Sequence, residues 1–373
     1  KTLHKTVFFI KLSIARNILK RKIEIARFLQ VRMKKVLIIS PQFVPVNSAD
    51  SHRVRQMLPY LAENGWSAEI AADNLSCLEK PVIDNKLLTT IPSDIIVHYV
   101  NAFDYRWTRK IGLGSLSIRS FYFYYSFLNK LLKGDNIDLI FFSTTSFHLF
   151  ALGPIMKRKF KIPYVLDIQD PWRSDFYLDK PKNERPPKFL LNYYLDKFLE
   201  AYSIPNSDGI ISVSKDYLHT FKLRYRRLTQ NLLTVPFSAT IHDYVHMSKE
   251  HDNMKKQDKL NIVYVGRGGH DLGFSISSFF EAIKKMEINE KLPSLNFEIS
   301  FIGTSYAPNG EGIQTIKPIA SKLGITSKVI EQTDRVGYFE AISIIQHADI
   351  LFIPGSTDPA YTASKIYPYI LAD

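Results

Sequence analysis

Cysteine is nearly absent from the sequence, since Cys77 is the only one among 373 residues. A single thiol excludes an internal disulfide and any metal site built from several cysteines, and it fits a reducing cytoplasm. A small, buried or half-buried apolar side chain is the simplest interpretation of Cys77. We therefore expect a cytoplasmic protein without structural disulfides, and we predict no metal site.

Long apolar runs are missing as well. The longest one, Leu139 to Met156, contains four consecutive hydroxyl residues and a histidine, so it is too polar to span a membrane. Hydrophobic residues make up 45% of the chain and charged residues 23%, which is the balance of a globular protein. Because 373 residues exceed one ordinary hydrophobic core, the length predicts two domains.

Net positive charge is scarce outside the N-terminal segment. Residues 1–35 contain eleven Lys or Arg against one acid, Glu24, and so carry ten of the thirteen net positive charges. The remainder is close to neutral, so we expect no nucleic-acid partner. Within residues 1–32, apolar side chains recur near helical spacing. This leader is either a basic amphipathic helix for an anionic membrane surface or a non-native extension ahead of an initiator-like Met33.

From Met33 onward, short β-prone runs alternate with longer helical patterns, which predicts parallel sheets covered on both faces. A polar stretch at residues 246–259 predicts a linker between an N-terminal domain, residues 33–245, and a C-terminal domain, residues 260–373. Two doubly wound domains of this kind would enclose a cleft. The last helix, expected from about Thr362, has no stop signal, so we expect the second domain to be incomplete at its C-terminus.

Apolar runs on both sides of the linker are predicted to be strands. In doubly wound sheets ligands bind at the carboxyl ends of the strands, so the loops that follow these runs are the places to seek function. The expected strands are Val36 to Ile39, Ala68 to Ala72, Ile95 to Val100, Leu139 to Phe142, Tyr164 to Ile168, Gly209 to Val213, Leu232 to Val235, Ile262 to Val265, Phe297 to Ile302 and Asp349 to Ile353. Helices are expected over Val54 to Leu61, Ser275 to Met286 and Tyr338 to Gln346.

The first of four candidate loops follows the opening strand. It contains Asn47 and Ser48 and leads into a helix that bears Arg53 and Arg55. Helix N-terminal amides and an arginine together suit an anion or a polar ligand, so we predict Asn47, Ser48 and Arg53 on the acceptor side. Arg55 is more simply explained as a solvent-exposed residue of an amphipathic helix.

The second loop, Asp167 to Arg173, follows a strand that is expected to be buried. Asp170 could orient or deprotonate a sugar hydroxyl, and Trp172 could stack on a sugar ring beside Arg173. A structural interpretation is equally open, because Asp170 before Pro171 is also typical of a helix cap. Strand alternation points Asp167 back toward backbone amides, which we expect it to cap.

The third loop surrounds an arginine with glycines, Gly266, Arg267 and Gly268. Glycines allow backbone amides to approach a diphosphate closely, and Arg267 adds positive charge. The loop lacks the full dinucleotide-binding fingerprint, so the glycines alone are weak evidence. We predict all three residues at a donor-binding site.

The fourth loop is rich in hydroxyl groups and runs into the last helix. Thr362, Ser364 and Lys365 lie together there and suit a phosphate. Ordinary capping of the helix by Thr362 or Ser364 is the structural alternative. Because this loop and the arginine loop belong to the same domain, we favour a ligand site and assign these three residues to donor binding.

These segments resemble the GT-B glycosyltransferases, and within them the family-4 enzymes that transfer sugars from nucleotide sugars with retention of configuration. The resemblance covers most of residues 33–373 and is most specific at Lys34 to Asp73, Pro163 to Trp172, Val265 to Arg267 and Ala348 to Pro354. It implies two Rossmann-like domains that face a cleft, with the acceptor bound by the first and the nucleotide-sugar donor by the second. The reaction it implies needs no metal and no other cofactor.

The resemblance also implies roles for single residues. Arg267 matches the arginine that contacts the donor diphosphate, and Ser364 with Lys365 matches the helix start beside the donor. Together with Asp170, we take Arg267 and Lys365 as the catalytic candidates. A site of this kind would act mainly by stabilising the charge of the departing nucleoside diphosphate.

Three positions depart from the family pattern. The lysine expected five residues beyond the arginine is Leu272, the glutamate expected to hold the donor ribose is Pro368, and an active-site histidine is replaced around Gln169. These substitutions remove side chains that the resemblance implies for ribose recognition and for catalysis. They favour, as an alternative, a GT-B-like protein that binds a nucleotide sugar or a partner without transfer.

The leading hypothesis is a cytoplasmic glycosyltransferase, peripheral to the inner face of the membrane. Its partners would be a nucleotide sugar, a lipid-linked or polysaccharide-precursor acceptor, and an anionic membrane surface. A nucleotide-sugar epimerase ranks below the two other hypotheses, and product formed without any acceptor would identify it. Removing residues 1–32 is expected to affect membrane association and not sugar transfer.

Overall fold

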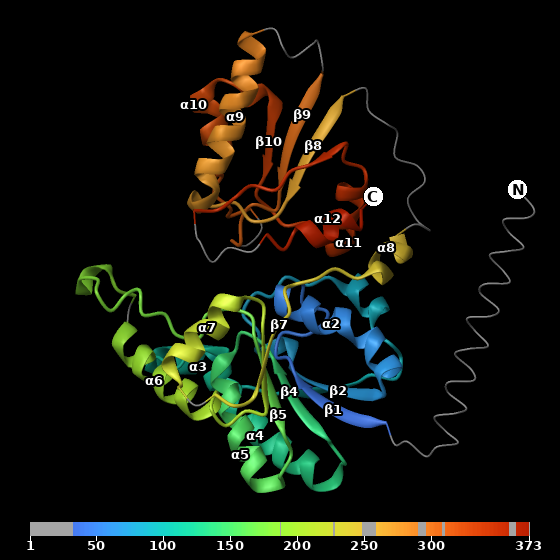
Figure 1. The fold of residues 1–373 in the computed structure, drawn as a ribbon, viewed down its shortest axis with the longest axis vertical. Helices are drawn as coiled ribbons and strands as arrows, with labels where there is room; N and C mark the ends of the chain where they lie inside the picture. Colours follow the sequence, from blue (N-terminus) through green and yellow to red (C-terminus); the bar gives the residue numbers. More distant parts are fainter. Residues whose placement is uncertain are drawn as a thin grey trace, which may run out of the picture.

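The computed structural model describes residues 33–186, 188–226, 228–247, 259–289, 296–307, 310–357 and 363–372. The chain forms two lobes, each built on one sheet (Figure 1). The predicted leader, most of the predicted linker and Thr362 lie outside the described residues. In the part of the chain that is described, none of the helices combines the length and the apolar character that crossing a membrane requires.

The first lobe is built on seven parallel strands in the order β3-β2-β1-β4-β5-β6-β7. Its central strands are apolar and buried, as expected for a sheet that helices cover on both faces. The chain moves outward from β1 to β3 and then returns to place β4 on the other side of β1, so its direction reverses between β1 and β4. The strands are β1 (Lys34–Ile39), β2 (Trp66–Asp73), β3 (Ile96–Val100), β4 (Leu139–Ser143), β5 (Tyr164–Ile168), β6 (Gly209–Ser212) and β7 (Asn231–Thr234).

Helix α2 shows how local sequence fixes these elements. The Ser48 side chain accepts a hydrogen bond from the first turn, Val54 and Leu58 form a buried face, and Gly65 ends the segment with a φ of 75°. The helices of this lobe are α2 (Ala49–Leu61), α3 (Tyr105–Thr108), α4 (Leu116–Gly134), α5 (Leu152–Phe160), α6 (Phe189–Ser203) and α7 (Lys215–Arg224). Its 3-10 helices are η1 (Ala62–Asn64), η2 (Leu75–Cys77), η3 (Asn85–Thr90), η4 (Arg109–Ile111), η5 (Phe147–Ala151) and η6 (Lys182–Glu184).

The second lobe has four parallel strands in the order β10-β9-β8-β11, so the chain direction reverses between β8 and β11. Strand β10 was not predicted, because its four residues, VIEQ, do not alternate between apolar and polar: Ile330 is exposed and Glu331 is buried, the reverse of the usual pattern. The strands are β8 (Leu260–Val265), β9 (Phe297–Ile302), β10 (Val329–Gln332) and β11 (Ile350–Leu351). The helices are α9 (Gly273–Ile288), α10 (Lys317–Leu323), α11 (Tyr338–Gln346) and α12 (Ile366–Ile370), with η7 (His270–Leu272) and η8 (Thr326–Lys328).

A buried ion pair joins α2 to α8 (Ile241–Met247) and, through Tyr338, to the second lobe. Arg55 donates to both carboxylate oxygens of Asp243, at 2.6 and 2.7 Å, and both side chains are almost fully buried. The Tyr338 hydroxyl donates to the same carboxylate at 2.7 Å, and its ring stacks on His52 with 4.2 Å between centroids. We call these four residues the interlobe junction. The expectation of a solvent-exposed Arg55 is wrong, because the fold supplies a buried carboxylate in place of water.

Candidate functional site

A cavity of about 580 Å³ lies between the two lobes. The carboxyl ends of both sheets open into it, as do both points where the chain direction reverses. This is the position at which doubly wound sheets bind ligands. The polar and aromatic side chains in its wall are those of Asn47, Ser48, Asp50, His52, Arg53, Gln56, Thr145, Gln169, Asp170, Phe237, Ser238, Tyr264, Arg267, Tyr306, Arg335, Tyr338, Ser364 and Lys365.

Lys365 lies on the second-lobe wall against Gly266. A Cβ atom at Gly266 would lie 2.7 Å from the Tyr264 hydroxyl and 3.2 Å from Lys365 Cε, so only glycine allows this close approach. Desolvation, followed by the positive charge of Arg335, lowers the pKa of Lys365. Ser364 lines the same wall, so the cavity brings together three of the predicted donor-binding residues.

Arg267 also lines the cavity, but a carboxylate of its own lobe engages it. Its guanidinium donates to both oxygens of Asp271, at 2.9 and 2.7 Å, and the Ser356 hydroxyl donates to that carboxylate at 2.8 Å. The hydrogen bonds between the pair raise the pKa of Arg267 and lower that of Asp271 to about 2. Both groups are therefore charged at neutral pH. A phosphate that binds Arg267 has to compete with Asp271.

Arg335 is a third cation on this wall, and sequence analysis missed it. It follows β10, and its guanidinium lies 5.1 Å from the ring centroid of Tyr306, in the loop after β9. Because β10 was not predicted, there was no reason in the sequence to expect Arg335 at the end of a strand. A search for Arg or Lys just beyond every short β-prone run would have found it.

Asp50 contributes a buried carboxylate to the first-lobe wall of the cavity. The sequence patterns did not single out this residue. One of its oxygens accepts hydrogen bonds from the Ser48 hydroxyl and the Ser51 amide. The other oxygen has no partner among the described residues, although the residue is only 5% exposed. Desolvation raises the pKa of Asp50, and the negative charge of Asp170 adds to the increase. A ligand hydroxyl in the cavity would satisfy this oxygen.

Asp170 lies on the same wall and does not cap a helix. The chain after it forms bends and turns, and the next α-helix, α6, begins at Phe189. The structural alternative for Asp170 therefore does not hold in this fold. Its carboxylate lines the cavity, and desolvation raises its pKa. Gln169, beside it, donates from Nε2 to the Ser143 hydroxyl at 3.1 Å.

Asn47, another predicted residue, is held in the wall by His52. Its Oδ1 lies 2.9 Å from His52 Nε2. Desolvation, followed by the charges of Arg55 and Lys365, lowers the pKa of His52 well below its usual range. The ring is therefore neutral at pH 7. Because Arg55 donates to His52 Nδ1, the Nε2 proton is donated to Asn47 and fixes its amide.

Arg53 reaches the cavity, but its charge is matched within the first lobe. Its guanidinium donates to both oxygens of Asp167, at 2.6 and 2.8 Å, and to the carbonyls of Val235 and Pro236 at 2.9 and 3.1 Å. Asp167 thus binds Arg53 and does not cap backbone amides, so that expectation is wrong. The pair fixes the chain after β7 against the end of β5.

Trp172 and Arg173 lie outside the cavity wall. Trp172 is 6% exposed, its ring stacks on Phe147 at 5.6 Å, and its Nε1 donates to Asp196 of α6 at 3.2 Å. Arg173 lies over the ring of Tyr193, also on α6, at 5.5 Å. The predicted contact of these two residues with an acceptor is therefore wrong. The chain turns inward after β5, and both side chains pack under α6.

Two of the three positions that depart from the family pattern, Leu272 and Pro368, add no polar side chain to the cavity, whereas Gln169 lines it. Leu272 is 1% exposed and belongs to the hydrophobic core of the second lobe. Pro368 borders the cavity, and its carbonyl accepts a hydrogen bond from the Tyr244 hydroxyl at 2.6 Å. Gly268, predicted for the donor, is packed away from the cavity, since a Cβ atom there would lie 2.5 Å from Thr315 Oγ1.

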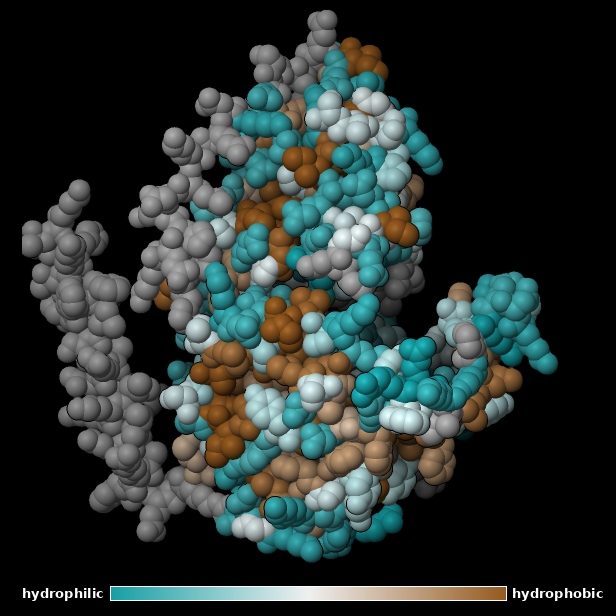
Figure 2. All heavy atoms as spheres, turned by 180° about the vertical axis from the view of Figure 1, so that it is seen from behind, coloured by the Kyte–Doolittle hydropathy of each residue, from teal (hydrophilic) through white to brown (hydrophobic). Residues whose placement is uncertain are grey.

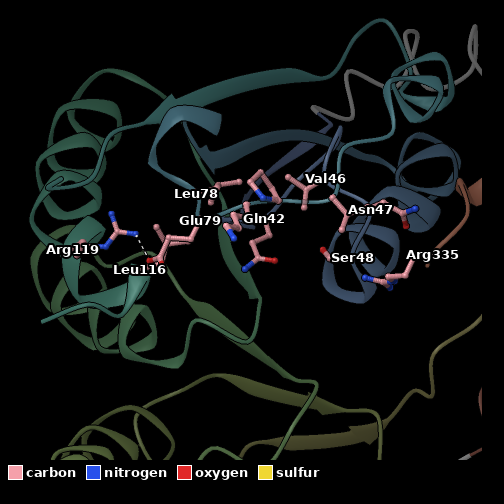
Figure 3. A pocket seen from close by; sticks show the side chains of 12 residues that line it. Gln42, Val46, Asn47, Ser48, Leu78, Glu79, Leu116, Arg119 and Arg335 are labelled. Carbon is pink, nitrogen blue, oxygen red and sulfur yellow. Dashed lines mark hydrogen bonds and ion pairs between the residues drawn. The ribbon is translucent and has the colours of Figure 1, made fainter. Parts of the chain in front are cut away.

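A smaller cavity of about 280 Å³ adjoins the first on the side of the first lobe (Figure 3). It shares Asn47, Ser48 and Arg335 with the larger cavity. At its other end Arg119 donates to Glu79 at 3.1 Å. An extended ligand would therefore find polar groups in both spaces. Among the described residues, no three His, Cys, Asp or Glu side chains gather in a way that would hold a metal ion.

Solved structures share this arrangement, whereas no protein-family model and no curated protein matches the sequence. HepE from Anabaena, in complex with UDP and glucose, has a TM-score of 0.54 and 14% identity, covering 91% of this chain and 78% of that chain. A trehalose-phosphate synthase from Burkholderia vietnamiensis has a TM-score of 0.55 and 10% identity, covering 91% and 82%. The fold is GT-B. Apo UGT2 from Phytolacca americana, with a TM-score of 0.51 and 9% identity, covers 90% and 79% and has the same GT-B fold.

Proposed function

We propose that the protein is a glycosyltransferase that moves a sugar from a nucleoside-diphosphate sugar to a hydroxyl group of a lipid-linked or saccharide acceptor. The division of charge across one cavity carries the proposal. Arg267, Arg335 and Lys365 line its second-lobe side, whereas Asp50 and Asp170 line its first-lobe side. A diphosphate suits the cationic wall, and the hydroxyl groups of an acceptor suit the carboxylates.

In the proposed reaction the acceptor oxygen bonds to the anomeric carbon while the bond from that carbon to the phosphate oxygen breaks. The nucleoside diphosphate departs with the bonding electrons, and Arg267, Arg335 and Lys365 stabilise its charge. Asp170 accepts the hydroxyl proton, for which its raised pKa suits it. We propose retention of configuration, in which the acceptor oxygen attacks the face of the anomeric carbon from which the diphosphate departs. We propose that no metal or cofactor takes part, since cationic side chains are available to neutralise the leaving group.

Donor turnover tests the proposal. The protein is incubated with UDP-glucose and with other nucleotide sugars, each with and without lipid-linked and soluble saccharide acceptors. Release of nucleoside diphosphate should be faster with the correct acceptor. UDP-glucose is a suitable first donor because HepE binds UDP and glucose. Tight donor binding without release in any mixture would instead support the alternative of a binding protein, which Leu272 and Pro368 favour. Product without acceptor would indicate an epimerase.

Arg267→Ala is expected to weaken UDP binding about 10- to 100-fold, because a lost charge-assisted hydrogen bond costs roughly 1.5 to 3 kcal/mol. Isothermal titration calorimetry measures the change. Asp271→Asn is the matched comparison, since it removes the carboxylate that competes for Arg267 and should leave UDP binding equal or tighter. Unchanged binding in Arg267→Ala would place the diphosphate elsewhere.

Asp170→Asn is expected to lower sugar transfer by about 10- to 100-fold while leaving the Kd for UDP unchanged. Asparagine keeps the size and polarity of the side chain but cannot accept the proton, and general-base catalysis contributes up to roughly 10⁴-fold. The readout is kcat together with the calorimetric Kd. Asp179→Asn, which changes an exposed acid outside the cavity wall, serves as the control. Full activity of Asp170→Asn would remove this residue from the reaction.

A further inference from the structure

Helix α6 directs polar side chains into the first lobe. Glu200 is fully buried, and Arg224 donates to both of its oxygens at 3.1 Å. One turn earlier, Asp196 accepts the hydrogen bond from Trp172 Nε1. A surface helix ordinarily buries an apolar stripe and exposes its polar side. The inner face of α6 instead mixes Glu200 and Asp196 with the apolar side chains of Tyr193 and Leu199.

The outer face of α6 is apolar. Leu191, Tyr194, Leu195 and Phe198 follow one another at the spacing i, i+3, i+4 and i+7, which places them in one stripe. Leu191 is 70% exposed, Phe198 68% and Tyr194 61%. Scattered surface leucines need no explanation, but a continuous stripe of this size marks an interaction surface.

The stripe continues onto α3 and η4. The Lys188 ammonium, just before α6, lies so close to Gly112 that a Cβ atom there would be 1.7 Å from it. Trp107 and Leu113, on either side of η4, are 70% and 44% exposed. We call Trp107, Leu113, Leu191, Tyr194, Leu195 and Phe198 the α6 surface. In Figure 1, α3 lies beside α6 and the chain before α6 projects from the lobe; Figure 2 shows that projection from behind, with hydrophobic and hydrophilic side chains next to one another.

Basic side chains surround the α6 surface. Arg109, Lys110, Lys182, Lys188 and Lys197 are exposed in the same segments. The exposed acids there that form no ion pair within the described residues are Asp179 and Glu184, so positive charge dominates. Apolar side chains bordered by lysine and arginine complement a bilayer surface that contains anionic lipids. A second copy of the chain fits less well, because a twofold contact would bring these cations together.

We propose that the α6 surface docks on an anionic phospholipid bilayer. The docking proposal depends only on the residues of the α6 surface. The idea that docking presents a lipid-linked acceptor to the cavity depends on the proposed function as well. Trp172, two residues after Asp170, donates from Nε1 to Asp196 of α6 at 3.2 Å, so the loop that carries Asp170 is tied to α6. Docking through α6 therefore holds the acceptor side of the cavity near the membrane.

Trp107 provides a reporter that is specific for this surface. The full chain is mixed with vesicles of phosphatidylcholine and phosphatidylglycerol whose acyl chains carry bromine. Quenching of tryptophan emission is compared between the wild type and Trp107→Phe. We expect quenching in the wild type that Trp107→Phe largely loses, because Trp172 is buried and Trp66, at the start of β2, is half-buried and outside the α6 surface. Equal quenching in both proteins, or sedimentation with vesicles without quenching, would overturn the proposal and assign binding to another part of the chain.

Substitution of the stripe gives a second test. Leu191→Glu with Phe198→Glu should reduce partition onto the anionic vesicles at least about 10-fold, and pure phosphatidylcholine should bind the wild type weakly. Ile288→Glu, which changes an equally exposed apolar residue of the second lobe, should have no effect. Unchanged partition of the double variant would contradict docking, as would self-association of the wild type that the double variant abolishes.

The same variants separate this proposal from the proposed function. Hydrolysis of UDP-glucose and transfer to a soluble acceptor should be unchanged in Leu191→Glu with Phe198→Glu, because neither residue lines the cavity. If the protein docks through α6 but does not use a nucleotide sugar, the docking proposal stands and the proposed transferase function is refuted.

Discussion

Asp243→Ala is expected to lower the free energy of unfolding by about 3 to 5 kcal/mol, the usual cost of removing one partner of a buried ion pair. Arg55 is 2% exposed and donates to both Asp243 oxygens, so the variant leaves a buried guanidinium without its counterion. The Tyr338 hydroxyl loses its acceptor at the same time. Urea denaturation followed by circular dichroism measures the change.

Two further variants test whether the loss of stability comes from leaving a buried charge without its partner. Arg55→Met combined with Asp243→Leu removes both charges and should recover most of the lost stability, because no unpaired ion remains. Arg106→Ala breaks an exposed pair with Asp104 but keeps the Asp104 cap of α3, and it should leave the denaturation midpoint almost unchanged. If Asp243→Ala behaved like Arg106→Ala, the interlobe junction would contribute nothing to stability.

Lys365→Met is expected to reduce kcat about 100- to 1000-fold, the scale on which removal of one group that stabilises transition-state charge lowers the rate. Lys365 lies against the backbone at Gly266, where the wall allows a ligand to approach closely. Its ammonium would meet charge that grows as the diphosphate departs, so kcat should fall further than donor affinity. Stopped assays of UDP release at saturating donor measure kcat, and calorimetry measures the Kd.

Lys365→Arg and Lys322→Met complete this test. The arginine variant keeps the positive charge and should retain more activity than Lys365→Met. Lys322→Met removes an exposed lysine from α10 in the same lobe and should not alter kcat. Equal losses in kcat and in donor affinity for Lys365→Met would mean that the lysine binds ground state and transition state alike, which argues against a role in catalysis.

Elements with strong periodicity were predictable from sequence. The bounds of β5, β9 and α11 agree with those expected, since each is a continuous apolar run or a regular helical pattern. Strand β10 was not predicted because its four residues show no alternation of apolar and polar side chains. The GT-B arrangement itself followed from the alternation of strands and helices together with the resemblance, and the matches to solved structures confirm it.

The roles of the site residues were harder to predict, because the role of a charged side chain depends on which group it binds in the folded protein. Gly266, Arg267, Ser364 and Lys365 could be placed in one cavity because each follows a predicted strand or lies at the start of the last helix. Arg55 was misassigned because its partner, Asp243, lies 188 residues further along the chain. The engagement of Arg267 by a neighbouring carboxylate likewise depends on rotamers that spacing does not specify.

The exposed apolar face of α6 bears on how quickly the protein would find its acceptor. A protein held on a bilayer searches for a lipid-linked molecule by diffusion in two dimensions. The relevant quantity is then the number of acceptor molecules per unit of membrane area, and not their amount per volume of solution. Diluting the acceptor with inert lipid, at constant total acceptor, should slow the docked protein and leave reaction with a soluble acceptor unaffected.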